Sequence, residues 1–388
     1  MTPDLLESIA TTAALPRERS QALPAAAYRD PALAEMEKDV LFKRHWISLG
    51  HVSQIPTPGD FLRVDLAGEP LLVIRGKDDA VRVLSRTCCH RGMDVMPTGF
   101  GHPDEGNRRV ILCPYHLWSY DLTGKLVGAP EMQHAEGFDR SAHCLHSFRS
   151  AIWEGLIFVD LSGEAPPIDE QLATLKADHL GKWQMAEARC VWSAHWDCAF
   201  NWKVLVENFM ECYHHLGAHR KSLEPFLPAK GCWTGPENPN FSMMHLPLKA
   251  TMQEEIQAAG QATTPFPVFP GLSLEDCLEW SIYLAYPNGL FFNAPDRFYW
   301  YRILPTGPET SSLLTTMFVH PSAPGIPDYD SVLQREIQAG IDFHLEDMEM
   351  CTATQRGLAS AGYQTGRLSH LEETIWQFQR YLARQLQS

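Results

Sequence analysis

The 388-residue sequence has no long apolar segment, since no run approaches the ~20 residues of a membrane-spanning helix. Its first residues also lack the basic and then apolar order of a secretory leader, so we expect a reducing cytoplasm. In that compartment the ten cysteines are expected to bind metal or to stay buried as thiols rather than to form disulfides. The sequence therefore predicts a cytoplasmic protein that does not cross a membrane.

Basic residues are scarce, with 32 Lys and Arg against 47 Asp and Glu and a net charge of −15. This balance excludes nucleic acid and anionic membrane as main partners, because both attract positively charged surfaces. Internal repeats and low-complexity tracts are absent as well. With 45% apolar residues, the chain is long enough for two or more domains with separate cores.

The first half of the chain predicts a helix over residues 31–46 followed by a small antiparallel β domain. Short runs rich in Val, Leu and Ile between residues 61 and 85 are separated by turn residues, which is typical of β-strands. Residues 151–161 predict one buried strand that closes this domain, and residues 162–169 predict a linker.

The second half predicts a helix over 170–178, a strand near 188–200, and a curved antiparallel sheet between residues 280 and 320. Two helices with apolar stripes are then expected near the C-terminus. The predicted stripes are Ile337, Ile341, Leu345 and Met348, and then Leu371, Ile375, Phe378 and Leu382.

Two short motifs in the β domain each pair a cysteine with a histidine. The first is Cys88-Cys89-His90-Arg91-Gly92, and the second begins Cys113-Pro114-Tyr115-His116. Two thiolates and two imidazoles form the ligand set of a Rieske [2Fe–2S] centre. They are equally the ligand set of a structural zinc site, so spacing alone leaves both possibilities open.

The stretch from Asn201 to His219 contains Glu211, His214 and His219. Two imidazoles and a carboxylate on one face of Fe(II) leave positions open for O2 and substrate. A helix would carry Glu211 and His214 on one face, and it must distort or end near residues 216–217 for His219 to reach the same ion. With 17 histidines in the chain, this pair alone is weak evidence for a metal site.

Asp347 lies between Glu346 and Glu349 in the predicted helix that follows the sheet. By charge pattern alone, these carboxylates are typical of a solvated acidic face rather than of a metal site.

Together these segments resemble the Rieske non-heme iron oxygenases in their catalytic alpha subunit. The motifs that carry the resemblance are CxHRG at Cys88–Gly92, CPYHxWxYxxxG at Cys113–Gly124, NWK…ENxxExYHxxxxH at Asn201–His219 and EDMEMCTATQRGL at Glu346–Leu358. The resemblance extends from about residue 30 to the C-terminus.

The family resemblance implies an α+β fold with a small antiparallel β Rieske domain and a helix-wrapped antiparallel sheet of helix-grip, START-like type. The expected divisions are an N-terminal arm and helix packing on the catalytic domain (1–45), the Rieske domain (46–162) and the mononuclear iron catalytic domain (163–388).

The resemblance also implies two metal centres. Cys88 and Cys113 would hold one cluster iron, and His90 and His116 the other. Cys89 stands where Arg is commoner in the family and is expected to be a bystander thiol. The interval between the half-motifs carries an insertion over residues 101–109, which we expect to be a polar surface loop near the docking face for an electron donor.

For the catalytic centre, the resemblance implies that His214, His219 and Asp347 hold a mononuclear Fe(II). Glu211 would bridge His214 to the cluster ligand His116 of the next subunit in a homotrimer, and Asn208 would lie near the iron. By resemblance, the chain is the oxygenase component of a multicomponent system. It would use O2 and electrons from a NAD(P)H-dependent flavin and iron–sulfur reductase, directly or through a ferredoxin, to hydroxylate a small organic substrate.

Within the family, Glu211, Leu117 and the tail after residue 355 look like the branch that oxidises glycine betaine, stachydrine or carnitine. That implies demethylation or C–N cleavage of an N-methylated cation. An aromatic cage would bind such a cation by cation–π attraction, with Tyr283, Phe292, Phe298 and Trp300 as candidates. In a strand, only alternate residues of the run 298–301 can face one cavity.

Two alternatives remain at this point. The same aromatic residues would stack on a ring, which predicts an aromatic-ring or aromatic-acid hydroxylase with the same iron chemistry. A non-catalytic, zinc-stabilised ligand-binding protein is the alternative from another class.

Overall fold

The structure is a computed structural model that describes residues 3–387, and it divides into two compact units. One unit is Phe42–Ile168, and the other joins the chain up to Leu41 with the chain from Asp169 onward. Sequence analysis placed these two divisions at residues 45/46 and 162/163. Among the described residues, no helix combines the length and the apolar character that crossing a bilayer requires.

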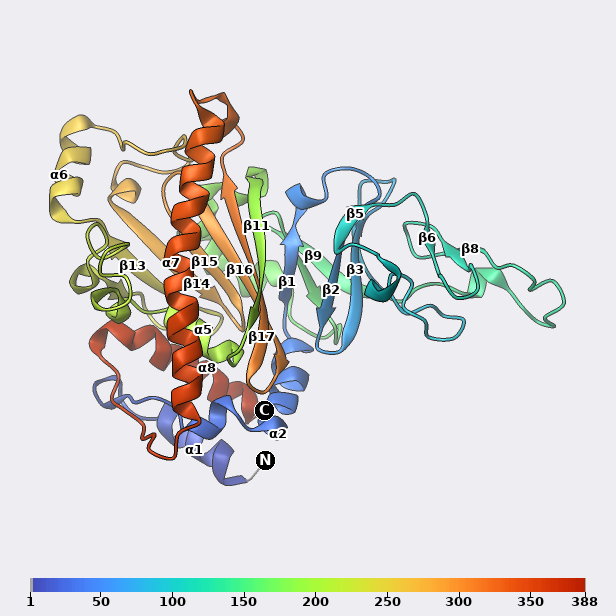
Figure 1. The fold of residues 1–388 in the computed structure, drawn as a ribbon, viewed down its shortest axis with the longest axis horizontal. Helices are drawn as coiled ribbons and strands as arrows, with labels where there is room; N and C mark the ends of the chain where they lie inside the picture. Colours follow the sequence, from blue (N-terminus) through green and yellow to red (C-terminus); the bar gives the residue numbers. More distant parts are fainter. Residues whose placement is uncertain (1–2, 388) are drawn as a thin grey trace. The chain divides into compact units, whose positions relative to one another are not determined.

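The smaller unit is an antiparallel β structure, as predicted (Figure 1). Its seven-stranded sheet has the order β1-β10-β9-β4-β3-β2-β5, and a separate three-stranded sheet has the order β6-β7-β8. The strands are β1 (Ile47–His51), β2 (Asp60–Leu66), β3 (Glu69–Arg75), β4 (Val81–Ser85), β5 (Glu105–Asn107), β6 (Ile111–Leu112), β7 (Ser119–Tyr120), β8 (Leu126–Gly128), β9 (Ser147–Trp153) and β10 (Leu156–Asp160).

One local prediction for this unit was wrong, and a second was incomplete. Residues 151–161 do not form one strand but a hairpin, in which β9 pairs with β10 across Glu154 and Gly155. Both turn residues have positive φ values, 48° and 80°, which matches the twist of a tight hairpin. The insertion at 101–109 is exposed as predicted, yet it also contains β5, which extends the sheet by pairing with β2.

The larger unit is a seven-stranded antiparallel sheet of order β11-β17-β16-β15-β14-β13-β12, with helices packed against it (Figure 1). Its strands are β11 (Arg189–Cys198), β12 (Trp233–Thr234), β13 (Phe241–Pro247), β14 (Glu279–Ala285), β15 (Gly289–Asn293), β16 (Arg297–Gly307) and β17 (Thr310–Val319). Its helices are α1 (Pro3–Ala13), α2 (Pro31–Glu37), α4 (Ala173–Asp178), α5 (Trp202–Phe209), α6 (Ala250–Ala259), α7 (Tyr329–Leu358) and α8 (Glu373–Leu386); α3 (Ile168–Gln171) lies at the boundary between the units. The predicted α+β fold is confirmed.

The long helix α7 crosses one face of this sheet (Figure 1). Phe343 on α7 packs edge-on against Phe292 and Tyr299, and His344 stacks on Tyr301. Gly340 allows this approach, because a Cβ there would lie 3.1 Å from the Tyr299 hydroxyl.

The predicted stripe of α7 is only partly correct, since Ile337 is buried and Ile341 and Met348 are half-buried. The helix buries Gly340, His344 and Cys351, whereas Leu345 of the predicted stripe is 49% exposed. Polar and small residues share the inward face because α7 carries part of the functional site, so apolar periodicity alone did not identify the buried residues. The second predicted stripe is correct: Ile375, Phe378 and Leu382 on α8 are buried, and so is Leu371 just before the helix.

Helix α5 is tied to α2 by a buried ion pair. Lys203 Nζ lies 2.7 and 2.9 Å from the two carboxylate oxygens of Glu37, and both side chains are at most 2% exposed. Trp202 donates a further hydrogen bond to Glu37. The Asn201 side chain caps the helix by accepting from the Lys203 backbone N–H. These contacts fix the segment that leads into the site.

Candidate metal and active site

Helix α5 ends at Phe209, earlier than the sequence predicted. The chain then makes a short 3-10 turn over Tyr213–Leu216, which carries His214, and His219 follows in an irregular segment. Glu211 and His214 therefore do not share one α-helix. The early break turns the chain so that both histidines face α7.

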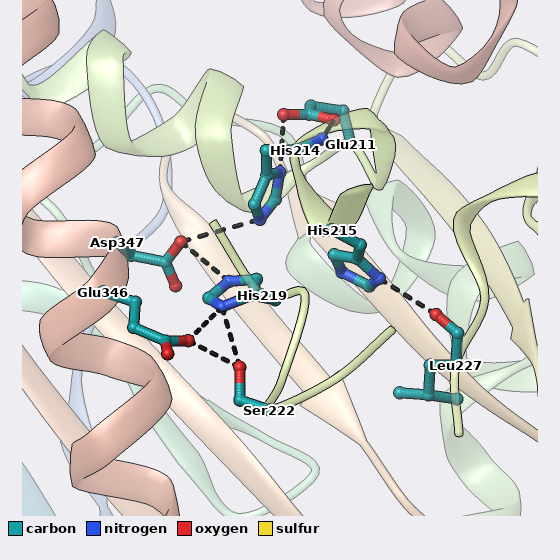
Figure 2. Close-up of polar contacts among 8 residues, drawn as sticks. All are labelled: Glu211, His214, His215, His219, Ser222, Leu227, Glu346 and Asp347. Carbon is teal, nitrogen blue, oxygen red and sulfur yellow. Dashed lines mark hydrogen bonds and ion pairs between the residues drawn. The ribbon is translucent and has the colours of Figure 1, made fainter. Parts of the chain in front are cut away.

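The structure brings His214, His219 and Asp347 together, with one ligand atom of each within 4.8 Å of the others (Figure 2). Nε2 of His219 lies 3.0 Å from Asp347 Oδ1, and Nε2 of His214 lies 3.6 Å from the same oxygen. Two imidazole nitrogens and a carboxylate oxygen form the facial donor set that suits Fe(II) and leaves other positions open. These three residues could hold the predicted mononuclear iron.

Each histidine is oriented by a second carboxylate. Glu211 Oε1 lies 2.6 Å from Nδ1 of His214, and Glu346 Oε2 lies 2.7 Å from Nδ1 of His219 (Figure 2). Ser222 donates a 2.5 Å hydrogen bond to Glu346 and so fixes that carboxylate. Such contacts keep the proton on Nδ1 and turn the Nε2 lone pair toward the metal position. Sequence analysis missed the role of Glu346, although its place beside Asp347 was a usable signal.

The charges at the site favour an ionised Asp347, but they also favour a proton on His219. Burial would raise the pKa of Asp347, but His219, His214 and a hydrogen bond from Asn208 outweigh it and lower that pKa. Burial lowers the pKa of His219, but Asp347 and Glu346 raise it by more, so the pKa of His219 is raised overall. A proton therefore competes with metal for His219, and metal would displace that proton.

A third histidine, which sequence analysis missed, lies beside the other two. His215 is buried and donates from Nδ1 to the backbone carbonyl of Leu227 at 3.1 Å (Figure 2). Burial, together with the neighbouring His214, lowers the pKa of His215 to about 3, so its ring is neutral. The ring lines the cavity at the metal position, where it can contact a substrate.

A narrow cavity of about 40 Å³ opens beside the three proposed ligands. Aromatic and aliphatic side chains form most of its wall, and no Lys or Arg of residues 3–387 lines it. The wall residues beyond the histidines and carboxylates are Phe209, Leu223, Leu246, Ile282, Phe292, Tyr301 and Phe343.

Of the four predicted pocket residues, the structure places only Phe292 at this cavity. Tyr283, Phe298 and Trp300 point to the opposite face of the sheet, where Phe298 stacks on Phe318. The strand register explains the difference, because Trp300 pairs with Phe291 whereas Tyr301 pairs with Leu290, and neighbouring residues alternate between faces. The sequence alone does not determine which set of alternate residues on this strand faces the cavity.

The remaining lining residues were missed for separate reasons. Tyr301 could have been found from its parity with Phe292, given the hairpin register. Phe343 precedes Asp347 by one helical turn, which places both on one face of α7. Phe209 stands at the end of α5, and its position depends on the helix break.

In the smaller unit, the two motif loops bring their cysteines and histidines together. Cys88 and Cys113 are buried at 2% and 1% exposure, and the rings of His90 and His116 lie 4.7 Å apart. Nδ1 of His90 is buried without a hydrogen-bond partner among the described residues, which suits a nitrogen that binds metal. Burial, His116 and Arg91 lower the pKa of His90, which favours the neutral ligand form. These residues fit the predicted cluster.

Tyr120, on β7 within the second motif, contacts both cysteines of the first motif. Its hydroxyl lies 3.0 Å from Cys88 Sγ and 3.3 Å from Cys89 Sγ. Cys89 itself is exposed, in keeping with the predicted bystander role. Leu117, in the second loop, has φ 60°, a left-handed conformation that favours glycine, and its side chain is 55% exposed.

Comparisons with known proteins agree with this arrangement. Residues 185–388 match the model of the ring hydroxylating alpha subunit (catalytic domain), and residues 45–148 match the Rieske [2Fe-2S] domain. The glycine betaine monooxygenase oxygenase subunit of Chromohalobacter salexigens is 28% identical over 386 residues, covering 92% of this chain and 84% of the relative. The biphenyl 2,3-dioxygenase subunit alpha of Rhodococcus jostii is 34% identical over 225 residues, covering 56% of this chain and 48% of the relative.

Among solved structures, the quaternary ammonium Rieske monooxygenase CntA aligns with a TM-score of 0.80 and 23% identity, over 97% of this chain and 98% of that one. At this identity the similarity concerns the fold alone. The match to the catalytic model spans more than half of the sequence. The chain therefore belongs to the ring-hydroxylating alpha-subunit family of Rieske non-heme iron oxygenases, with a Rieske [2Fe–2S] cluster and a mononuclear iron as cofactors.

Proposed function

We propose that this oxygenase hydroxylates an N-methyl group, or the carbon beside it, of a small quaternary ammonium compound. The unstable product would then break at the C–N bond. The glycine betaine monooxygenase subunit named above supports this substrate class, because it aligns along nearly the whole chain.

The observation that carries the proposal is the narrow aromatic cavity at the metal position. Its volume is about 40 Å³, so its aromatic side chains lie close to any group that is held beside the metal position. Phe343 lies edge-on to Phe292 with ring centres 6.0 Å apart, and Tyr301 lies edge-on to Phe209 at 5.1 Å. Such rings attract a methylated cation, and no Lys or Arg of the described residues lines the cavity.

The proposed roles follow from the contacts. When bound, the cluster supplies electrons and the iron activates O2. His214, His219 and Asp347 would hold the iron, while Glu211 would fix the His214 tautomer and Asn208 would hold the Asp347 carboxylate by its hydrogen bond. The neutral ring of His215 would orient the substrate.

We also propose the predicted division of labour and a homotrimer. Residues 46–162 would carry the cluster, residues 163–388 the catalytic iron, and residues 1–45 would brace the catalytic domain. In support, the cluster loops expose Tyr115 and Leu117 by 53% and 55%, and the catalytic unit exposes Tyr213 by 50% beside His214. Matching apolar patches at the two metal sites suit a head-to-tail ring of copies, in which His116 of one copy meets Glu211 of the next.

As the oxygenase subunit of a multicomponent system, the chain needs a reductase. We propose a NAD(P)H-dependent flavin and iron–sulfur reductase, which donates directly or through a ferredoxin. The exposed segment 101–109 beside the cluster motif is the proposed contact for this donor.

The second candidate is an aromatic-ring or aromatic-acid hydroxylase. The sequence similarity to the biphenyl dioxygenase subunit favours it, and the same aromatic wall would stack on a ring if Phe343 turned aside. The non-catalytic zinc-stabilised binding protein is set aside, since the chain belongs to an oxygenase family.

Oxygen uptake by the reconstituted protein with a surrogate reductase tests the proposal. The panel would contain glycine betaine, carnitine and stachydrine on one side, and benzoate and biphenyl on the other. We expect coupled oxygen uptake and formaldehyde or aldehyde release with a methylated compound. Uptake with hydroxylated product from an aromatic compound alone would establish the second candidate instead.

A further inference from the structure

A carboxylate outside the metal site lies partly buried where α5 meets the N-terminal arm. Both carboxylate oxygens of Glu207 lie 2.8 Å from the hydroxyl of Tyr28, which donates to them. Tyr28 is 3% exposed, and no other hydrogen bond reaches the Glu207 side chain among those found in the described residues. A carboxylate with one neutral donor is poorly stabilised as an anion.

The charged and titratable groups around Glu207 come from four segments. Lys203 lies one turn earlier on α5, but its ammonium is already paired with Glu37. Glu372, at the start of α8, and Tyr363, in the preceding loop, also interact with Glu207. Burial is the largest influence, and with Glu372 it outweighs Tyr28 and Lys203 and raises the pKa of Glu207 to about 7.

Glu207 lies on the wall that two cavities share. A recess of about 660 Å³ reaches it from the side of Glu211 and His214, and a second cavity of about 290 Å³ reaches it from the side of Tyr28 and Tyr363. Val204 and Thr354 complete the shared wall. Both cavities are large enough for water, and Glu207 and Thr354 offer it hydrogen-bond partners in each; such hydrogen-bonded water conducts protons.

Oxygenation at the neighbouring site consumes protons. In the monooxygenation RH + O2 + 2 e⁻ + 2 H⁺ → ROH + H2O, the O–O bond breaks, one oxygen enters a C–H bond and the other leaves as water. The reductase supplies the electrons, but the protons must reach a site that is mostly apolar. Dioxygenation has the same requirement for two protons.

We propose that Glu207 is the proton reservoir of the catalytic unit: it holds a proton at neutral pH, passes it through the recess toward Glu211 and His214 during turnover, and recovers one through the cavity beside Tyr28. Glu207 contacts neither substrate nor metal, so it acts on the reaction through the recess. The proposal rests on the proposed position of the iron and is independent of which substrate is oxidised.

Infrared difference titration of the holoprotein tests the first part. We expect a carboxylic-acid C=O band that disappears with a midpoint near pH 7 and is absent in Glu207→Gln. Tyr28→Phe removes a hydrogen bond that favours the anion and should shift the midpoint upward. Glu349→Gln, a change at an exposed carboxylate on α7, is the matched control and should leave the band unchanged. A band that survives Glu207→Gln, or that never appears, overturns the proposal.

Dioxygen consumption by the dithionite-reduced holoprotein, with and without glycine betaine, tests the second part. Loss of a positioned proton donor should slow Glu207→Gln by about 10²-fold, with iron content and cluster signal unchanged. The rate of the unmodified protein should fall as pH rises through 7, and that of the variant should not depend on pH there. An equal rate with an unchanged pH profile in the variant overturns the proposal. Failure of every panel compound would overturn the proposed substrate class but not this inference, because consumption without substrate is measured as well.

Discussion

Glu346 Oε2 lies 2.7 Å from Nδ1 of His219. With the contact between Glu211 and His214, each of the two imidazoles beside Asp347 is thus oriented by a carboxylate of its own. Both Nε2 atoms thus face one carboxylate oxygen. The site is organised by hydrogen bonds to the far side of each ring, so changes at these carboxylates should affect metal binding directly.

We expect Glu346→Gln to weaken Fe(II) binding by about 10- to 100-fold, because His219 loses the carboxylate that fixes its tautomer and raises its basicity. Iron titration of the apoprotein measures the change. Glu349→Gln on the same helix is the control and should bind iron normally, since that side chain is exposed. Equal affinities for the two variants would contradict the supporting role of Glu346.

Replacing the proposed ligands should separate the two metal centres. His214→Ala or Asp347→Ala should remove one iron per chain and leave the EPR signal of the reduced cluster intact. Cys88→Ser should do the reverse and also destabilise the smaller unit, because metal binding contributes folding free energy. Iron content and the EPR signal of the reduced cluster together show which of the two centres each variant has lost. Loss of both centres in either variant would mean that the assignments are wrong.

Glu211→Gln should retain both metals and lose turnover with a methylated substrate. The amide keeps the size of the side chain but removes the negative charge that holds His214, and with it the proposed link to His116 of a second copy. Single-turnover product yield, measured on protein with full iron content, is the test. Product at the unmodified rate would refute the bridging role.

The buried pair of Lys203 and Glu37 gives a prediction about stability. Lys203→Met leaves the Glu37 carboxylate buried without its charged partner, which should cost about 3–5 kcal/mol. The double variant Lys203→Met/Glu37→Gln should recover much of that loss. Lys38→Met removes the exposed pair with Glu35 and should cost less than about 1 kcal/mol. Urea unfolding curves of the four proteins provide the comparison.

Glu207 makes the stability of the larger unit depend on pH. Its pKa rises from 4.5 to about 7 on folding, so the folded chain binds this proton more tightly than the unfolded chain. The contribution of Glu207 is therefore fully present below about pH 4.5 and is lost as pH rises to about 7. Glu207→Gln should be more stable than the unmodified protein at pH 8, by up to about 3 kcal/mol, and similar to it at pH 4.5. Thermal unfolding at the two pH values checks the sign.

Sequence analysis located the three proposed ligands because they lie in motifs that are local in sequence. It also predicted the strands between residues 61 and 85 and between 280 and 320, since their apolar runs are short and bounded by turn residues, but it missed β5, the β9–β10 hairpin, β12 and β13. The end of α5 was placed too late, because the break after Phe209 depends on packing against α7 rather than on a Gly or Pro signal.

The cavity wall was the least predictable part of the site. Whether Trp300 or Tyr301 faces the metal depends on the register between β15 and β16, which two consecutive aromatic residues cannot reveal. Phe343 and Phe209 reach the cavity from elements far apart in the sequence. A composition rich in aromatic residues indicated the kind of wall but not which residues form it.

The left-handed backbone at Leu117 has an energetic consequence for the cluster loop. A leucine in that conformation costs roughly 1–2 kcal/mol that a glycine would avoid, and in a single copy its side chain gains little because it is mostly in solvent. Burial of that side chain against another surface would offset this free-energy cost, because apolar area would be removed from water. In the proposed ring of copies, a second copy would cover the tip of this loop, so the leucine would be unfavourable in a lone copy and favourable in the ring.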